Sequence, residues 1–227
     1  MHTAENAATT ARIALWLAML SLLVACGQQT PSAASVKRAA RTLATSLCEG
    51  CHGAEGRSTD AAVPIIAAQQ QPYVELQLKA FRNQGREEPK GHEFMRDVSS
   101  KWLLSDQVVA GIAEYFSSQA PPPGKPGDPA VTAKGKRLYE KGSSNDYRLN
   151  EKGSSYYPRI LPCSDCHGDN AQGIEIFPRL AGQHAEYLVK QMQRMHETER
   201  ASRKMHSVIG ELGDSEIVAV ATYLQSK

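Results

Sequence analysis

The sequence predicts an all-α protein built from one helical module that is used twice. Apolar residues recur at helical spacing in several separate stretches, and no stretch shows the apolar/polar alternation of a half-buried strand. When Pro64 is set against Pro178, the residues that follow align without a gap. Identical pairs are Ala67 and Ala181, Gln69 and Gln183, Tyr73 and Tyr187, Gln77 and Gln191, and Arg86 and Arg200. Two copies of one module therefore account for most of the 227 residues.

The composition excludes several classes of protein. Lys and Arg total 26 against 24 Asp and Glu, so a net charge of +2 gives no electrostatic support for binding nucleic acid. With 41% hydrophobic residues and mixed charge, the chain as a whole is not disordered. Five cysteines are too few for a disulfide scaffold. Their spacing is therefore more informative than their number.

The N-terminus predicts export and a lipid anchor. Arg12 precedes an apolar run, Ile13 to Ala25, which is shorter than the roughly 20 residues that span a bilayer, so residues 1–25 are predicted to be a signal peptide. The run ends in Leu-Val-Ala-Cys, which resembles a bacterial lipobox and implies cleavage before Cys26 and acylation of that cysteine. An ordinary signal peptide is the alternative. Residues 26–35 would form a flexible leash to a bacterial membrane, with the protein on its periplasmic side.

The two modules, expected over residues 36–119 and 132–227, share one order of predicted helices. The last helix of each has a residue suited to an N-cap before it, in Ser105-Asp106 and Gly213-Asp214. The helices are expected over Val36–Leu47, Tyr73–Phe81 and Val108–Phe116 in the first module, and over Thr132–Lys141, Tyr187–Met195 and Ile217–Leu224 in the second.

Two further segments differ from the repeat. Residues 120–131 are rich in Pro and Gly, which do not suit a helix interior or a central strand, and predict a stiff linker. Residues 142–162 form an insertion found in the second module alone. Their Gly, Ser and Tyr content predicts a surface loop with no assignable chemistry.

Each module carries one Cys-x-x-Cys-His-Gly motif. Its residues are Cys48, Cys51 and His52 in the first module and Cys163, Cys166 and His167 in the second. Two thiols three residues apart can each add to a haem vinyl group, and the following histidine supplies an iron ligand. Two such motifs predict two covalently attached haem c groups. A zinc site pooling four cysteines would leave both histidines unexplained, and a redox dithiol would need a βαβ pattern.

A sixth iron ligand is expected shortly before the last helix of each module. Met95 and Met205 occupy that position, and a Met thioether raises the haem potential and closes the iron to small molecules. His92 is the alternative in the first module. In the second, His206 is adjacent to Met205 and stays open as an alternative.

From about Val36 to Lys227 the chain resembles dihaem cytochrome c of the cytochrome c4 type. The resemblance is carried by the tandem motifs and by the Pro, Ala-x-Gln, Tyr, Gln, Arg and Met that follow each one. It implies two tandem class I cytochrome c domains that pack about a pseudo-two-fold axis. It also implies that the carbonyls of Pro64 and Pro178 accept a hydrogen bond from the proximal imidazole. The lipobox, the insertion and a short loop before Met205 depart from the family pattern.

The expected function is outer-sphere transfer of single electrons between redox partner proteins, without catalysis. The net charge is small, so partner docking would depend on local surface patches. Two alternatives remain open. The lipid tether would suit an electron-accepting subunit of a larger dehydrogenase or oxidase. Atypical ligation through His92 or His206 would suit a dihaem enzyme, such as a peroxidase or a cytochrome that oxidises sulfur compounds.

Overall fold

Helices dominate the structure, as the sequence predicts. The computed structural model describes residues 31–83, 85–86, 92–102, 105–143, 160–197 and 203–227. Among these residues the β pairings are two isolated bridges, Ser143 with Ile160 and Ile174 with Phe177. No helix within the described ranges is long and apolar enough to cross a membrane. Val36–Lys227 forms one compact unit.

Several predicted features lie outside the described residues. They are the signal peptide (1–25), the lipobox residue Cys26, and most of the 142–162 insertion. The described chain enters its first helix at Ala33, so the end of the predicted leash is helical.

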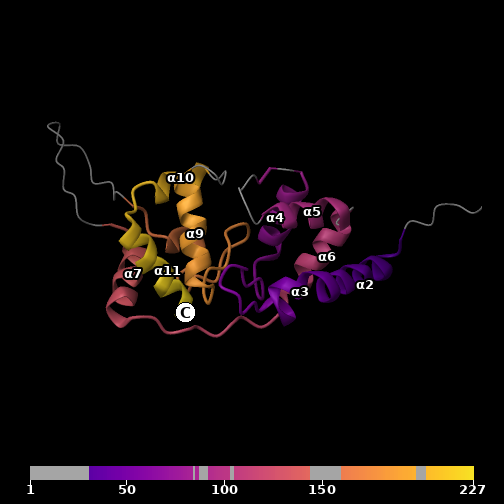
Figure 1. Ribbon diagram of the computed structural model, residues 1–227, viewed down its shortest axis with the longest axis horizontal. Helices are drawn as coiled ribbons and strands as arrows, with labels where there is room; N and C mark the ends of the chain where they lie inside the picture. The colour runs from indigo at the N-terminus through magenta and orange to yellow at the C-terminus, as the bar shows by residue number, and fades with distance from the viewer. Residues whose placement is uncertain (1–30, 84, 87–91, 103–104, 144–159, 198–202) are drawn as a thin grey trace, which may run out of the picture. The chain divides into compact units, whose positions relative to one another are not determined.

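The first half of the chain comprises the helices up to α6. They are α2 (Ala33–Leu43), the π-helical turn η1 (Ala44–Cys48), α3 (Glu49–His52), the 3-10 turn η2 (Ala54–Gly56), α4 (Gln71–Arg82), α5 (His92–Trp102) and α6 (Asp106–Ser117). The indigo-to-magenta helices gather as one group (Figure 1). Helix α6 begins as predicted, because the Ser105 hydroxyl accepts a hydrogen bond from the Val108 N–H.

The first half has a single hydrophobic core. Two small residues, Ala40 of α2 and Ala44 of η1, are fully buried against Val109, Ile112 and Phe116 of α6. Side chains of α4 complete the cluster, and Met95 of α5 packs against it. The core thus joins the first and last helices of this half to the helix that carries the predicted ligand.

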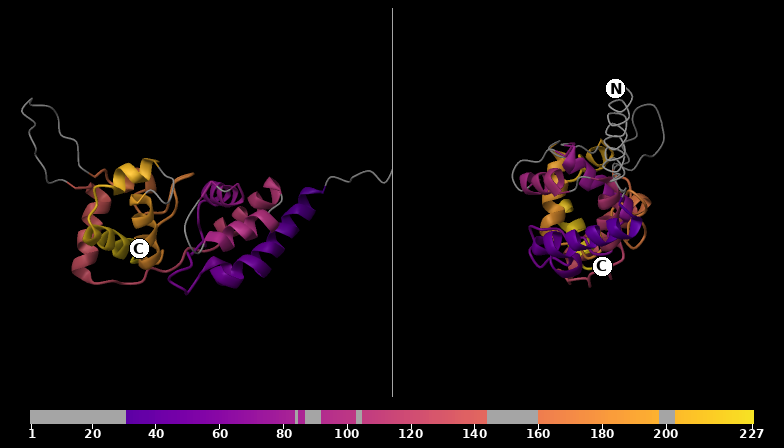
Figure 2. Two further views of the ribbon diagram at one scale, coloured as in Figure 1. Left: turned by 45° about the horizontal axis from the view of Figure 1, so that its top comes forward. Right: turned by 90° about the vertical axis from the view of Figure 1, so that its right-hand side faces the viewer.

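The second half repeats this arrangement. Its helices are α7 (Pro129–Lys141), α8 (Ser164–His167), α9 (Ala185–His196), α10 (Arg203–Ile209) and α11 (Asp214–Gln225), and they form the salmon-to-yellow group of Figure 2. Helix α7 begins three residues earlier than predicted. The Asp128 carboxylate caps it by accepting from the N–H groups of Ala130 and Val131, and Pro129 fits at the first turn.

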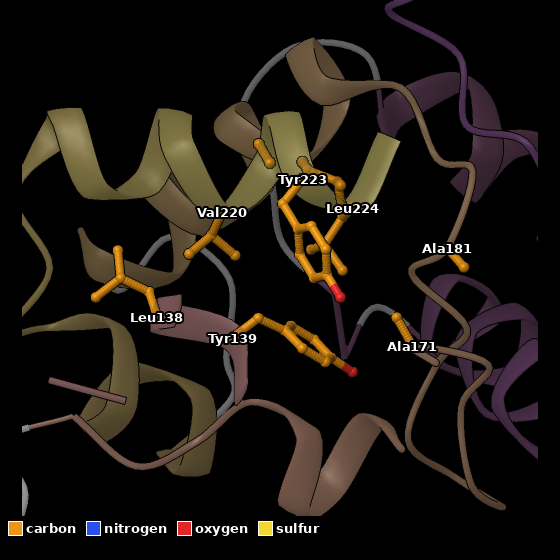
Figure 3. Close-up of a cluster of buried hydrophobic side chains, with 9 residues drawn as sticks. Leu138, Tyr139, Ala171, Ala181, Val220, Tyr223 and Leu224 are labelled. Carbon is orange, nitrogen blue, oxygen red and sulfur yellow. The ribbon is translucent and has the colours of Figure 1, made fainter. Parts of the chain in front are cut away.

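The core of the second half is divided into two clusters. One lies between α7, α9 and α11 and contains the rings of Tyr139 and Tyr223, whose centroids are 5.5 Å apart (Figure 3). The other surrounds Ile160 and Ile209, and Met205 of α10 packs against it. Tyr139 is fully buried and donates from its hydroxyl to the Gly168 carbonyl, 2.6 Å away. This bond ties α7 to the turn after the second motif.

The proline-rich linker between the halves is bound along the surface of the second half. The Lys125 N–H donates to the carbonyl of Gln225, at the end of α11, with a distance of 2.9 Å. Pro122 is buried and lies against Gly182. The linker is therefore held by contacts as well as stiffened by its composition.

Candidate functional site

In each Cys-x-x-Cys-His motif the residues after the first cysteine form a short helix that ends at the histidine. In the first half, η1 and α3 run on from α2 without a break, so the cysteines and His52 share one helical stretch. Gly53 then ends α3 with a φ of 76°, and a β-carbon at this position would lie 2.6 Å from the Arg57 carbonyl oxygen. Gly168 ends α8 with a φ of 81°. Only glycine adopts this backbone readily, which accounts for the His-Gly ending of both motifs.

Both histidines are buried and held in one tautomer. His52 Nδ1 donates to the Pro64 carbonyl at 2.8 Å, and His167 Nδ1 donates to the Pro178 carbonyl at 2.9 Å. Because a carbonyl only accepts, Nδ1 carries the proton and Nε2 carries a free lone pair. His167 Nε2 is buried without a hydrogen-bond partner. An Nε2 lone pair that accepts no hydrogen bond is available to coordinate an iron atom.

Burial also sets the protonation of these groups. It lowers the pKa of His52 and of His167, and the hydrogen bonds to the proline carbonyls oppose this shift only in part. Both imidazoles are therefore neutral at pH 7. Burial raises the pKa of Cys48 and of Cys163 to about 11, so both are thiols when no haem is attached. Cys51 and Cys166 are exposed, and all four of these cysteines are free.

The predicted sixth ligands lie on the helices that precede α6 and α11. Met95, on α5, packs against the same cluster as Cys48. Met205, on α10, is partly buried against the Ile160 cluster. The neighbouring His206 is exposed, and its Nδ1 donates to the Met195 carbonyl at 2.9 Å, which holds its ring against the end of α9. The side chain of His92 lies outside the described residues.

These observations fit two haem groups better than a single metal ion. Each half provides two thiols and a neutral imidazole with its Nε2 lone pair free, which are the groups that haem attachment needs. Within the part of the chain that the structure describes, no three His, Cys, Asp or Glu side chains are grouped to hold a metal ion.

A helical fold with two thiol pairs, each followed by an oriented imidazole, defines a c-type cytochrome with two haem sites. The Cytochrome c family model matches residues 132–227. Cytochrome c4 of Azotobacter vinelandii is 30% identical over 217 residues, which cover 92% of this chain and 97% of the relative. The cytochrome c4 structure from Acidithiobacillus ferrooxidans is 31% identical with a TM-score of 0.68, and the match covers 79% of this chain and 98% of that chain.

The chain therefore belongs to the cytochrome c4 family. It has two tandem class I cytochrome c domains, carries two haem c groups and acts as an electron carrier. A third similarity is to the thiosulfate dehydrogenase TsdBA of Marichromatium purpuratum, which is 28% identical with a TM-score of 0.68. The match covers 84% of this chain and 40% of that chain.

The role of two aligned glutamines is not evident from the sequence alone. Gln69 and Gln183 each form hydrogen bonds from one half of the chain to the backbone of the other half. The sequence indicates only that both modules carry glutamine at this aligned position. Without the fold, nothing in that pattern separates an interface residue from a polar residue on a helix face.

Proposed function

We propose that each haem iron is held by one histidine and one methionine. The proposed ligand pairs are His52 with Met95 and His167 with Met205. Cys48 and Cys51 would form the thioether bonds to the first haem, and Cys163 and Cys166 those to the second. The strongest support is the orientation of the two imidazoles, because the bond from Nδ1 to a proline carbonyl leaves Nε2 free in each half. In the second half, the hydrogen bond of His206 to Met195 favours Met205 as the ligand.

In this assignment the chain's own residues fix ligation and exclude water. A bound haem supplies the reversible ferric/ferrous couple. Pro64 and Pro178 orient the imidazoles and raise their basicity as ligands. The side chains of Met95 and Met205 would occupy the remaining ligand position of each iron, which favours electron transfer over chemistry at the metal.

We propose the same division of the chain that the repeat indicates. The first domain would cover residues 36–119 and the second residues 132–227, with the 142–162 insertion as a loop of the second. Support comes from the repetition of helix order and from the two separately packed cores. Because α7 begins at Pro129, residues 129–131 would join the second domain rather than the linker (120–131).

The test of the ligand set is replacement of each methionine by alanine. The ferrous wild-type protein should not bind CO, while Met95→Ala and Met205→Ala should each bind one CO per chain, measured by optical titration. Met192→Ala removes a partly buried methionine of α9 that is not a proposed ligand, and it should bind none. A Met95→Ala protein that stays closed to CO would transfer the role to His92.

We also propose that the mature protein is exported and anchored by acyl chains on Cys26. The support is the lipobox-like Leu-Val-Ala-Cys at the end of a run too short to span a bilayer. Several acyl chains hold a protein on a membrane far more firmly than one does. In fractionated cells, haem-stained wild-type protein should be found with the membrane. Cys26→Ser protein should move to the soluble exported fraction with both haems attached, and its retention after a high-salt wash would contradict the anchor.

A second candidate role is that of an electron acceptor within or beside a dehydrogenase. It is favoured by the similarity to part of the thiosulfate dehydrogenase TsdBA chain. In this role thiosulfate alone would not reduce the purified protein, whereas thiosulfate with a catalytic amount of a thiosulfate dehydrogenase would do so. Absorbance of the ferrous haem measures both reactions. If thiosulfate reduces the protein equally slowly with and without the dehydrogenase, the electron donor is another protein.

A further inference from the structure

The two halves are joined by a reciprocal pair of buried glutamines. Gln183, in the second half, donates from Nε2 to the Ile65 carbonyl at 2.8 Å and accepts at Oε1 from the Ile65 N–H at 3.0 Å. Gln69, in the first half, makes the same two bonds to Arg179, at 3.0 Å and 2.7 Å. The glutamines are 6% and 7% exposed, respectively. Each side chain therefore acts as a two-bond clamp on the backbone of the other half.

The clamped residues directly follow the two prolines that orient the histidines. The Pro64 carbonyl and the Ile65 N–H belong to a single peptide group, as do the Pro178 carbonyl and the Arg179 N–H. His52 Nδ1–H thus donates to one end of a peptide group whose other end donates to Gln183. These are two linked hydrogen bonds that run from one half of the chain to the other.

Linked hydrogen bonds strengthen one another. When a peptide N–H donates to an acceptor, its own carbonyl becomes more negative and accepts more strongly. A stronger bond at Nδ1 makes an imidazole a more basic ligand, and this stabilises ferric over ferrous iron. The glutamine of one half thereby acts on the proximal histidine of the other.

We propose that Gln183 is a positioning residue for His52, that Gln69 is one for His167, and that each clamp lowers the reduction potential of the haem in the opposite half. The proposal depends on the two histidines being the proximal ligands, as proposed above. It gives the interface a function beyond holding the halves together, because the potential of each haem is set partly by a residue of the other half.

Neighbouring contacts provide matched controls. Gln70 donates from Nε2 to the Gln172 carbonyl at 2.8 Å, and its aligned partner His184 donates from Nε2 to the Ser58 carbonyl at 2.9 Å. These bonds also join the two halves, but neither acts on a peptide group that accepts from the imidazole of a proximal histidine; the Gln172–Gly173 peptide group meets only the backbone carbonyl of His167. Loss of either would loosen the interface without acting on Pro64 or Pro178.

The experiment compares Gln183→Leu, Gln69→Leu and Gln70→Leu as holoproteins. Reduction potentials come from spectroelectrochemical titration. In the ferrous state, ¹H–¹⁵N NMR follows the Nδ1–H of each histidine, which identifies the haem affected. Gln183→Leu should raise the potential of the first haem and shift the His52 signal upfield, leaving the second haem unchanged. Gln69→Leu should do the converse, and Gln70→Leu should change neither.

A second substitution protects the test from a loosened interface. Gln183→Glu keeps an acceptor opposite the Ile65 N–H, so it should not raise the potential of the first haem. Equal shifts of both haems, a shift confined to the half that carries the substitution, or the same shift in Gln70→Leu would each overturn the proposal. If His52 and His167 are not iron ligands, the result is different, because the wild-type protein itself would then lack the NMR signals of two iron-bound histidines.

Discussion

The first and last helices of each half cross closely, but the glycine that permits the crossing is on opposite helices in the two halves. In the first half, Gly111 on α6 faces Ala40 on α2, and a β-carbon on Gly111 would lie 2.5 Å from the Ala40 β-carbon. In the second half the glycine is Gly135 on the first helix, α7, and a β-carbon there would overlap the backbone carbonyl of Ala219 on α11. The two halves therefore share the close approach of the helices rather than the residue at a given position.

A tyrosine on the last helix shows a second difference. Tyr115 and Tyr223 occupy equivalent positions on α6 and α11. The Tyr115 hydroxyl donates to Glu49 at 2.7 Å, and this bond is the main cause that raises the tyrosine's pKa. The Tyr223 hydroxyl is buried without a hydrogen-bond partner. Ser164 replaces Glu49 in the second motif, so the hydroxyl has lost the carboxylate that it meets in the first half.

The largest expected effect comes from removing one attachment site. Replacing both Cys163 and Cys166 by alanine should leave one covalent haem per chain, because no thiol remains to add to the vinyl groups of the second haem. Intact-mass spectrometry should show the loss of one haem. The matched Cys48→Ala/Cys51→Ala protein should lose the other haem. Retention of two haems in either double variant would contradict the assignment.

The next effect concerns the helix crossings. Gly135→Ala should lower the free energy of unfolding by about 1–3 kcal/mol or more, because the added methyl meets backbone that cannot rotate away. Gly111→Ala should cost less, since it meets a side-chain methyl. Adding Ala40→Gly to Gly111→Ala should restore most of the loss by moving the glycine to the first helix, as in the second half. Denaturant unfolding of the holoproteins measures each free energy. A double variant no more stable than Gly111→Ala would contradict the idea that the glycine can lie on either helix of the crossing.

A smaller effect separates the two tyrosines. Tyr223→Phe should raise stability by about 1 kcal/mol, because it removes a buried hydroxyl without a partner. Tyr115→Phe should lower it by about 0.5–1.5 kcal/mol through loss of the bond to Glu49. Thermal unfolding of the holoproteins should give changes in Tm of opposite sign for the two variants. Destabilisation by both would indicate that Tyr223 has a partner in the holoprotein.

The smallest effect is a pH dependence that arises from an ion pair in the first half. A hydrogen bond from Arg82 to Asp106, 2.7 Å long, is the main cause that lowers the pKa of this carboxyl below 3.8. Because the folded-state pKa is the lower one, the ion pair stabilises the fold above pH 3.8, and the gain is lost as pH falls through the folded pKa. Asp106→Asn should slightly reduce the loss of folding stability at acid pH, measured by denaturant unfolding of the holoprotein at several pH values.

Much of the fold followed from residue patterns, and the remainder depended on contacts between distant segments. Apolar spacing predicted the helices around Tyr73 and Tyr187, and Ser105 correctly predicted the start of α6. The early start of α7 depended on the Asp128 cap, which the proline-rich composition concealed. The role of Gln183 could not be predicted, because its bonds go to backbone atoms of a residue 118 positions away, and backbone partners leave no sequence pattern.

The position of the linker has a consequence for the lifetime of the protein. A proline- and glycine-rich segment between two domains is an ordinary place for proteolysis, yet a protease needs its target to detach and become extended. Here the Lys125 N–H is bonded to Gln225, and Pro122 is buried. Cleavage would first require release of the linker from the end of α11. Degradation should therefore begin elsewhere, and intact single-haem fragments should be rare among the breakdown products.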